Sequence, residues 1–502
     1  MFHFFGKKKI EVKKKYFESD KKIPHSIDQS LAYLQKKLGK TEEVKIRHLY
    51  LQNGQYHLSV VFMDSITDSQ KLNKLIESIQ NTKEMNINDK HQLLNELINN
   101  ILPFSQISIL KSMSEIIESI LSGHSALLIE GIDASLSINM KKEEIHHTVV
   151  LSEGSSFIED INTNIRLIRN RCKHEGLRFL KFKIGQMTNT EVNLVFIDGI
   201  CEKKLVQEIK QRIDQMDIDD EYESFYIEEW IVDHPTSIFP QMNYTERPEK
   251  VVDMLLKGHV AIVVDGAPWS FIAPTVFLQF FSSDGNRRLN PFLSNFLNTL
   301  RILSFFFSIL FPPLYIALTT IHQEILPTSL ALQMAAARSV VPFPTIIEAL
   351  IIELTLLILR EASVKLSTSI GNLISIVGII IAGQVAVGAG IVSSFMFIVI
   401  ALSGISSFMI SNYSIEFVTR VLRFPFMIIA SILGLPGIII SMLILIAYMA
   451  SVQSFGVPYL APITPYSSLD IKGTFIRNSL AKKRKKIYKN RQRSEFEVEK
   501  KE

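Results

Sequence analysis

The sequence predicts an α/β N-terminal region of two repeated subdomains, followed by an α-helical, multi-pass transmembrane domain. Three observations indicate this fold class. No Asp, Glu, Lys or Arg occurs from Leu366 to Ile415 or from Phe424 to Leu469. Most of the charge lies in residues 1–285, where apolar runs are short and similar stretches occur twice. The mean hydropathy of +0.20, in a chain that is 21% charged, is therefore the average of two unlike halves.

The composition excludes several classes of protein. A chain of 502 residues is long enough to bury a sizeable core, and by size alone it holds about three or four domains. Its two cysteines, Cys172 and Cys201, form at most one bridge. This excludes a disulfide-stapled secreted module and a cysteine-based zinc or iron–sulfur site. The formal net charge of +4 is close to neutral for a chain of this length.

The charge distribution divides the chain into five predicted segments. Residues 1–21 are basic, but no apolar core of signal-peptide length follows them, so we expect the N-terminal half to stay in the cytoplasm. The remaining predicted segments are a first α/β subdomain at 22–155, a second at 156–285, a transmembrane domain at 286–465 and a basic cytoplasmic tail at 466–502.

A duplication underlies the two subdomains, at an offset of 134 to 135 residues. The matching stretches are LSVVFMDSI (58–66) with VNLVFIDGI (192–200), and GHSALLIEG (123–131) with GHVAIVVDG (258–266). The apolar periodicity gives each copy a helix, two strands, a second helix and a strand that ends in an acidic residue and a glycine. Asp64, Asp198 and Asp265 are predicted to be turn formers that bond nearby backbone amides, in preference to metal or phosphate ligands.

Apolar length predicts five spanning helices, because a helix needs about 20 apolar residues to cross a bilayer. They cover residues 296–320, 345–361, 370–389, 392–411 and 424–453. Loops expected to be cytoplasmic carry Arg360 with Lys365, and Arg420 with Arg423. Five crossings would place the basic tail outside, which the same rule disfavours. A break at LGLPG (433–437) would make the last run a hairpin, so five to six helices are expected.

No enzymatic motif is present. The sequence has no GxSxG, HExxH or GxGxxG pattern, and GKT at 39–41 lacks the first glycine and the preceding strand of a phosphate loop. His146 and His147 have no partner at a metal-ligand spacing and are predicted to lie in a solvated loop. The basic runs at 7–15 and 482–493 are predicted to contact anionic lipid headgroups, not nucleic acid. We therefore expect no catalytic residue, cofactor or metal.

Ionisable residues occur where the membrane is expected. The second predicted span contains Glu348 and Glu353 and ends in Arg360 and Glu361, and Arg338 precedes it. Such groups cost about 2.5–3.5 kcal/mol each at bilayer depth, so they normally face a protein interior or water. On a helix, Glu353 and Arg360 share a face, whereas Glu348 lies about 140° from Glu353.

Three interpretations of these charges are open. Around the axis of an oligomer, Glu348 or Glu353 would form a ring that lowers the energy of cations in a pore. In a chain that works alone, the same acids would bind the coupling ion of a transporter. In the third interpretation they pair with Arg338, Arg360 or backbone groups and only hold helices together.

A polar segment follows the first predicted span. It places His322, Gln323 and Glu324 beside the helix-stopping Pro327, and is a candidate gating or coupling loop. Further along, the small residues of 371–390 suit close helix contacts, either between copies of the chain or within it.

Several membrane stretches are specific enough to compare with known families. They are PPLYIALTTIHQEILPTSL (312–330), ARSVVPFPTIIEAL (337–350), LREASVKL (359–366), SNYSIEFVTRVLRFP (411–425) and SFGVPYLAP (454–462). Together they resemble the GerA family, which comprises the A subunits of spore germinant receptors. The stretches 245–266 and 162–171 also resemble this family. The likeness covers about residues 115–465, whereas residues 1–110 and those after 470 are divergent.

The resemblance implies a multi-pass protein of the spore inner membrane, with its N-terminal region on the core side, that takes part in nutrient-triggered germination. It implies a permease-like, germinant-binding B subunit and a lipoprotein C subunit as partners. It also implies a homo-oligomer of A subunits that acts as a nutrient-gated cation channel, and it brings no catalytic residue. The alternative is a secondary transporter, or a non-conducting accessory or scaffold subunit of a membrane complex.

Overall fold

The structure is a computed structural model with two compact units, residues 1–231 with 244–273 and residues 232–243 with 274–502. It describes residues 21–464 except 40–42, 52–55, 83–89, 105, 143–155, 186–187, 217–223, 283–288, 365–376, 379–380 and 382. The predictions that lie outside the described residues concern 1–20, most of GKT at 39–41, the His146–His147 pair, most of the span at 370–389 and the tail at 466–502.

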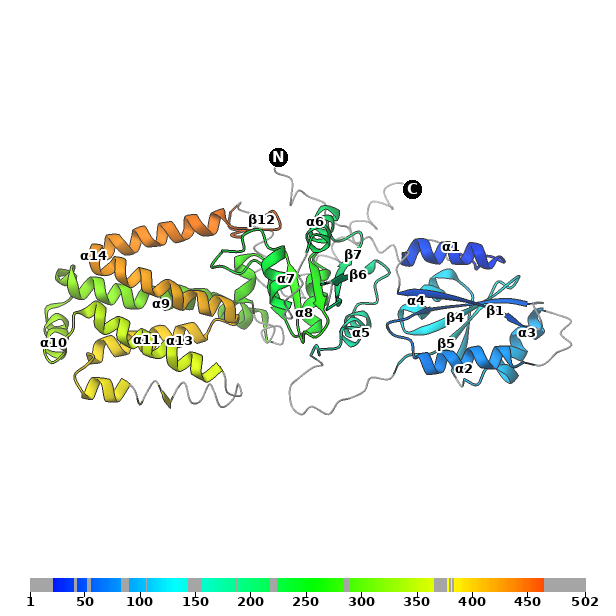
Figure 1. The fold of residues 1–502 in the computed structure, drawn as a ribbon, viewed down its shortest axis with the longest axis horizontal. Helices are drawn as coiled ribbons and strands as arrows, with labels where there is room; N and C mark the ends of the chain where they lie inside the picture. Colours follow the sequence, from blue (N-terminus) through cyan, green and yellow to red (C-terminus); the bar gives the residue numbers. More distant parts are fainter. Residues whose placement is uncertain are drawn as a thin grey trace, which may run out of the picture. The chain divides into compact units, whose positions relative to one another are not determined.

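The first half of the α/β unit is built on a five-stranded sheet with strand order β1-β2-β4-β5-β3. Its elements are α1 (Ile27–Leu38), β1 (Val44–Leu51), β2 (Tyr56–Met63), α2 (Ser69–Gln80), α3 (Lys90–Glu96), the π-helix η2 (Leu97–Ile101), β3 (Ile107–Leu110), α4 (Met113–Leu121), β4 (His124–Ile129) and β5 (Ser135–Asn139). Every neighbouring pair of strands is antiparallel. Separate apolar clusters cover the two faces of the sheet, one beneath α2 and one beneath α1 and α4 (Figure 1).

The second half repeats this topology with strand order β6-β7-β9-β10-β8. Its elements are α5 (Ile161–Arg171), β6 (Leu177–Ile184), β7 (Thr190–Ile197), α6 (Lys203–Asp214), α7 (Ser224–Ile231), β8 (Asn243–Thr245), α8 (Pro248–Leu255), β9 (Val260–Val264) and β10 (Ser270–Ala273). The α/β class predicted for the N-terminal region is therefore confirmed. The short edge strands β3 and β8 and the strands β5 and β10 were not predicted. The exact subdomain boundaries stay a prediction.

One hydrogen bond recurs in both halves and explains the acidic residue at the strand end. Glu130, after β4, accepts from the backbone N–H of Ile27 at 3.0 Å, and Asp265, after β9, accepts from that of Ile161 at 3.2 Å. Each carboxylate thus satisfies one free N–H in the first turn of a helix. Asp265 has the predicted structural role, but the prediction of a nearby amide was wrong, because its partner lies 104 residues away.

A buried ion pair joins the two halves of the α/β unit. Arg169 of α5 is 1% exposed and contacts both carboxylate oxygens of Glu43, with its Nε at 3.1 Å from Oε1. Glu43 also accepts from the Ser65 hydroxyl at 2.5 Å, and Arg169 donates to the carbonyl of Leu177 at 3.2 Å. These contacts satisfy charges that would be costly to bury alone.

The second unit consists mainly of helices. They are the 3₁₀ turn η3 (Phe277–Phe281), α9 (Pro291–Thr320), the 3₁₀ turn η5 (Gln323–Ile325), α10 (Thr328–Arg338), α11 (Thr345–Val364), α13 (Ser394–Phe408) and α14 (Tyr413–Ser451). The helices α11, α13 and α14 all pack against α9, and a small hairpin of β11 (Gln453–Ser454) and β12 (Val457–Pro458) follows α14. Figure 1 shows α9 running along the length of this unit with the other helices around it.

The helix α14 breaks at Gly434, inside the LGLPG stretch where a break was predicted. Gly434 has φ +64° and ψ −142°, a conformation essentially restricted to glycine. Figure 1 shows α14 as two arms that run in different directions. Leu445 of the second arm lies in the same apolar cluster as Leu422 of the first arm, so the chain folds back along itself. The predicted break is confirmed, and the first arm begins at Tyr413, earlier than the predicted 424.

An aromatic cluster joins distant segments of the helical unit. Phe277 packs edge-on against Phe305 of α9, and Phe239 and Tyr459 pack beside it. The backbone N–H of Phe277 donates to the carbonyl of Tyr459 at 2.8 Å, and that of Thr275 donates to the Ser454 hydroxyl at 3.0 Å. Segments distant in the sequence are thereby packed against the middle of α9.

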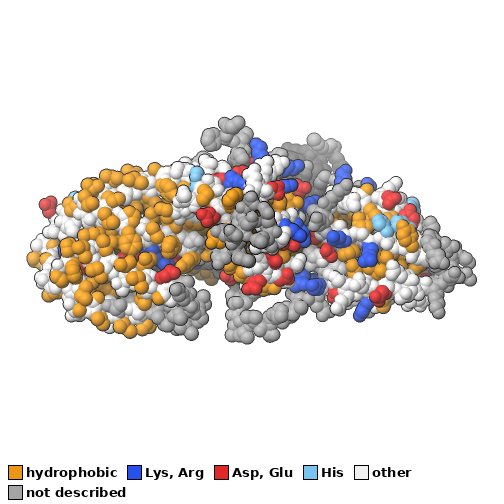
Figure 2. All heavy atoms as spheres, viewed as in Figure 1, with side chains coloured by type: hydrophobic (Ala, Val, Ile, Leu, Met, Phe, Trp, Pro, Cys, Tyr) orange, Lys and Arg blue, Asp and Glu red, His pale blue; other side chains and the backbone are white. Residues whose placement is uncertain are grey.

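Two helices in the described part of the chain are long and apolar enough to cross a membrane, α9 and α14. The helix α13 is apolar but shorter, and α11 carries four ionisable residues, at 348, 353, 360 and 361. Figure 2 shows a visible face of the helical unit that is covered mostly by hydrophobic side chains. The predicted number of five to six spans stays a prediction.

A candidate site of buried charges

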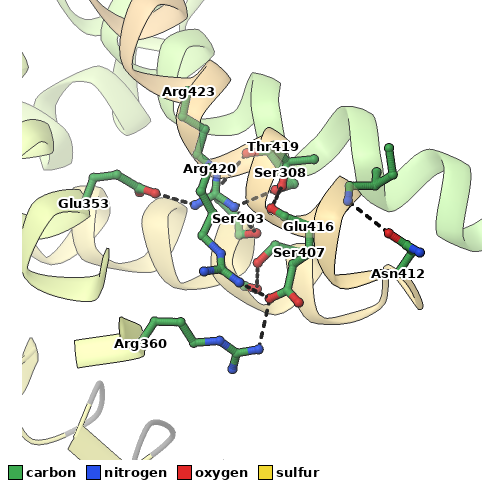
Figure 3. A network of polar contacts seen from close by, with 12 residues as sticks. Ser308, Glu353, Arg360, Ser403, Ser407, Asn412, Glu416, Thr419, Arg420 and Arg423 are labelled. Atoms are coloured by element: carbon green, nitrogen blue, oxygen red, sulfur yellow. Dashed lines mark hydrogen bonds and ion pairs between the residues drawn. The ribbon is translucent and has the colours of Figure 1, made fainter. Parts of the chain in front are cut away.

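The helical unit contains a network of buried charges between α11 and α14 (Figure 3). Its centre is Arg423, which is 2% exposed and donates to Glu353 of α11 at 2.6 Å. The other guanidinium nitrogen donates to the hydroxyl of Ser308 on α9 at 2.6 Å and to the carbonyl of Ser403 on α13 at 3.3 Å. One arginine therefore connects four helices, with its charge balanced by a carboxylate that is 3% exposed.

A second acid lies about two turns before Arg423 along α14. Glu416 accepts from Arg420 at 2.5 Å and from Arg360, at the end of α11, at 3.0 Å. The guanidinium of Arg360 also lies over the ring of Phe408, 4.3 Å from its centre. Glu416, Arg420 and Arg423 follow a spacing of four and then three residues, which places them on one face of the helix.

The two clusters together hold three arginines and two glutamates. Each carboxylate lies beside at least one arginine cation. Breaking one buried pair leaves a charge without a partner, which is more costly than replacing both members. The network therefore favours one particular register of α11 against α14.

The start of α14 corrects the predicted loop positions of Arg420 and Arg423. The side chain of Asn412 caps the helix by accepting from the N–H of Ile415 at 3.3 Å, so the helix begins before both arginines. Both are buried helical residues and not loop charges, at 7% and 2% exposure. The alternation of one acid and two bases in SIEFVTRVLRFP was the signal for a buried, charged helix face.

Glu348 occupies a different environment from Glu353. It is fully buried in the first turn of α11, and one carboxylate oxygen accepts from the backbone N–H of Ser393 at 2.6 Å and from the Ser393 hydroxyl at 2.5 Å. Ser393 is the N-cap of α13. Glu348 thus satisfies donors at the start of α13, and it forms no ion pair with another described residue.

The remaining predicted site residues lie apart from this network. Arg338 is half-buried at the end of α10, and Glu361 is exposed on α11. Neither forms an ion pair with a described residue. Neither Arg338 nor Arg360 is the partner of these acids. Glu348 accepts from a backbone N–H and a hydroxyl of Ser393, and backbone groups were among the predicted partners, whereas Glu353 pairs with Arg423. In a single chain both acids face the protein interior, and a pore-lining role stays a prediction.

The predicted gating loop lies against the break of α14. A Cβ atom at Gly434 would lie 2.6 Å from Nε2 of His322, so the ring packs directly over the glycine. Gln323 donates to the carbonyl of Thr319 at 2.8 Å, which continues the end of α9. Glu324 is exposed, and Pro327 is the N-cap residue of α10. The sequence indicated the loop and the break separately, but not their contact.

The chain therefore combines a duplicated α/β region with a unit of apolar helices that contains buried ion pairs. Two of the described helices are long and apolar enough to cross a membrane. The family model for "Bacillus/Clostridium GerA spore germination protein" matches residues 32–488. The chain is 36% identical to spore germination protein KA of Bacillus subtilis over 470 residues, which cover 91% of this chain and 85% of that protein. The chain belongs to the GerA family of spore germination proteins.

Two further relatives are similar over most of their length. Spore germination protein GerQA of Bacillus cereus is 36% identical over 80% of this chain and 83% of its own. Spore germination protein A1 of Bacillus subtilis is 33% identical over 92% of this chain and 95% of its own length. The crystal structure of the N-terminal domain of the A subunit of the Bacillus megaterium spore germinant receptor GerK3 is 29% identical. The matched region covers 52% of this chain and 98% of the GerK3 domain, and the TM-score is 0.42.

Proposed function

We propose that the chain is the A subunit of a spore germinant receptor, and that copies of it surround a nutrient-gated path for monovalent cations in the spore inner membrane. A permease-like B subunit binds the nutrient, and a lipoprotein C subunit completes the receptor. The N-terminal α/β region faces the spore core. Membership of the GerA family and the apolar surface of the helical unit support this assignment.

The observation that carries the gating proposal is the ion pair between Glu353 of α11 and Arg423 of α14. Ionisable residues inside apolar helices are rare and are usually functional. The pair has two discrete states, closed or separated, and separation exposes a carboxylate on α11. A signal from the B subunit that shifts α11 against α14 would therefore open the pair and create a negatively charged surface along the cation path.

This proposal gives the network a closed-state function. Arg423 neutralises Glu353 while the pair is formed, so the carboxylate does not attract cations. Arg360 and Arg420 hold the end of α11 to Glu416 in the same way. A ligand shifts such an equilibrium only by its difference in affinity for the two states, so the B subunit must contact the open arrangement better.

Cation efflux from spores tests the proposal. Spores that carry Glu353→Gln or Glu348→Gln are compared with spores that carry Leu354→Ile, a change at an exposed side chain of the same helix, at matched protein levels. We expect Glu353→Gln to release potassium at lower nutrient concentrations, because the closed state has lost its pair. Loss of the acid at either position is also expected to change the preference among monovalent cations.

Two outcomes would overturn the proposal. Normal efflux and normal ion preference in both acid variants would remove these residues from the path and the gate. Nutrient accumulation that depends on this chain, without a change in cation efflux, would instead support a transporter. A non-conducting scaffold predicts that every point variant either assembles and behaves normally or fails to assemble.

A further inference from the structure

A second polar cluster in the helical unit has oxygen atoms without hydrogen-bond partners. They are the free carboxylate oxygen of Glu348, the hydroxyl of Thr345 and the hydroxyl of Tyr315. The three residues are 0%, 1% and 6% exposed. A buried polar atom without a partner costs about 1–3 kcal/mol. Three such atoms close together are available to bind a ligand.

The three oxygens come from helices that meet at one place. Thr345 and Glu348 are one turn apart in the first turn of α11, so they share a face. Tyr315 belongs to α9, and its hydroxyl lies near Ser393 and Glu348 without forming a hydrogen bond of normal geometry. Tyr315 belongs to an apolar cluster that also contains Ala349, which follows Glu348, and Val392, which precedes Ser393. Tyr315, Glu348 and Ser393 therefore lie close together, and Thr345 is one turn from Glu348.

The charge of the cluster selects the ligand. The backbone N–H and hydroxyl of Ser393 donate to the other oxygen of Glu348 at 2.6 and 2.5 Å, and Glu348 lies in the first turn of its own helix. Both donors contact the same carboxylate oxygen, so the free oxygen of Glu348 is left for a further ligand. Among the described residues, no cation forms an ion pair with Glu348. Arg338 acts electrostatically on Tyr315 and lies half-buried at the end of α10.

We propose that Glu348, Thr345, Tyr315 and Ser393 form a binding site for one dehydrated monovalent cation. Carboxylate and hydroxyl oxygens are the ligands that hard cations prefer. One carboxylate among neutral hydroxyls balances a single positive charge, so a monovalent ion is favoured over a divalent one. The bound ion holds α9, α11 and the start of α13 together.

This site shares Glu348 with the efflux experiment above, so the two proposals are distinguished by what is measured. The cation proposed here is a structural ligand of each chain, and its binding is measured in purified protein that neither conducts ions nor meets a B subunit. The site is separate from the Glu353–Arg423 pair, whose carboxylate already has a cationic partner. Failure of the proposed function would therefore leave this proposal intact, and the reverse also holds.

Hydrogen exchange in the purified full-length chain tests the site. Peptides from α11 and α13 are followed by mass spectrometry in detergent, in NaCl, KCl or N-methylglucamine chloride at equal ionic strength. We expect slower exchange in sodium or potassium, with a saturable dependence on concentration. Glu348→Gln is expected to raise the apparent Kd for the ion by about tenfold or more, and Thr345→Val by a smaller factor.

Thr355→Val is the matched control, because Thr355 is exposed on the same helix and its hydroxyl donates to the carbonyl of Ile351 at 2.7 Å. It is expected to keep the wild-type ion dependence. If Glu348→Gln does not fold, Thr345→Val keeps the carboxylate and tests the hydroxyl alone. Equal exchange in all three salts would overturn the proposal. Protection that depends on pH and not on the metal ion would show a bound proton in its place, and would overturn it as well.

Discussion

Glu353 and Arg423 are 70 residues apart in the sequence and form a 2.6 Å ion pair between α11 and α14, at 3% and 2% exposure. Arg423 also donates to Ser308 and to the carbonyl of Ser403. This arrangement satisfies most of the buried polar atoms of the pair, which is the condition for a buried ion pair to be tolerated in an apolar interior.

The first prediction is that single and double substitutions of this pair are strongly non-additive. Glu353→Met or Arg423→Met leaves one buried charge and is expected to destabilise the helical unit by about 3–5 kcal/mol. The double variant removes both charges and is expected to recover most of that loss. The measurement is the temperature at which half of the detergent-solubilised protein stays soluble. Losses that simply add in the double variant would show that the two side chains act independently.

The second prediction concerns the break of α14. Gly434→Ala forces a side chain into φ +64° and places its Cβ 2.6 Å from His322 Nε2. We expect a loss of about 2 kcal/mol or more, from backbone strain and from the close contact. Gly404→Ala is the control, because its helical position has open space around it and is expected to be neutral or slightly stabilising.

The double variant Gly434→Ala with His322→Ala separates the two causes. Removing the ring relieves the contact but not the backbone strain, so thermal stability should recover only in part. Complete recovery would show that the glycine conformation itself contributes nothing. No recovery would show that the ring of His322 has no role at the break.

The third prediction concerns the pair that joins the two α/β halves. Arg169→Met leaves Glu43 buried without its cation, and should lower the free energy of unfolding by about 3 kcal/mol. Arg171→Met, on the same helix, breaks a partly exposed pair with Glu249 and should cost less than about 1 kcal/mol. The two tryptophans of the chain, Trp230 and Trp269, both lie in the α/β unit, so their fluorescence during urea unfolding measures this region. Equal losses of unfolding free energy in the two variants would show that burial does not decide how much each ion pair contributes.

The sequence predicted the classes of structure better than the partners of single residues. The duplication at 58–66 and 192–200 indicated two similar sheets, because repeated apolar patterns require repeated cores. The position of the α14 break was also predicted, since LGLPG contains both helix-breaking residue types. Periodicity places Glu353 on a helix face, but it does not identify which helix covers that face. The contact with Arg423 depends on how α11 and α14 pack, which no local pattern contains.

The last prediction is a pH dependence that originates at His259, just before β9. Burial, with a smaller effect of Lys257, lowers the pKa of His259 from 6.5 to about 4. The unfolded chain therefore binds a proton near pH 6.5 that the folded chain does not bind until about pH 4. The contribution of this group to stability is fully present above pH 6.5. It is lost as the pH falls through that interval, with a limiting slope of about 1.4 kcal/mol per pH unit. Tryptophan-monitored urea unfolding at several pH values should show this slope in the wild type and a flatter one in His259→Gln. An unchanged slope in the variant would assign the effect to other groups, such as His124, whose pKa is also lowered by burial.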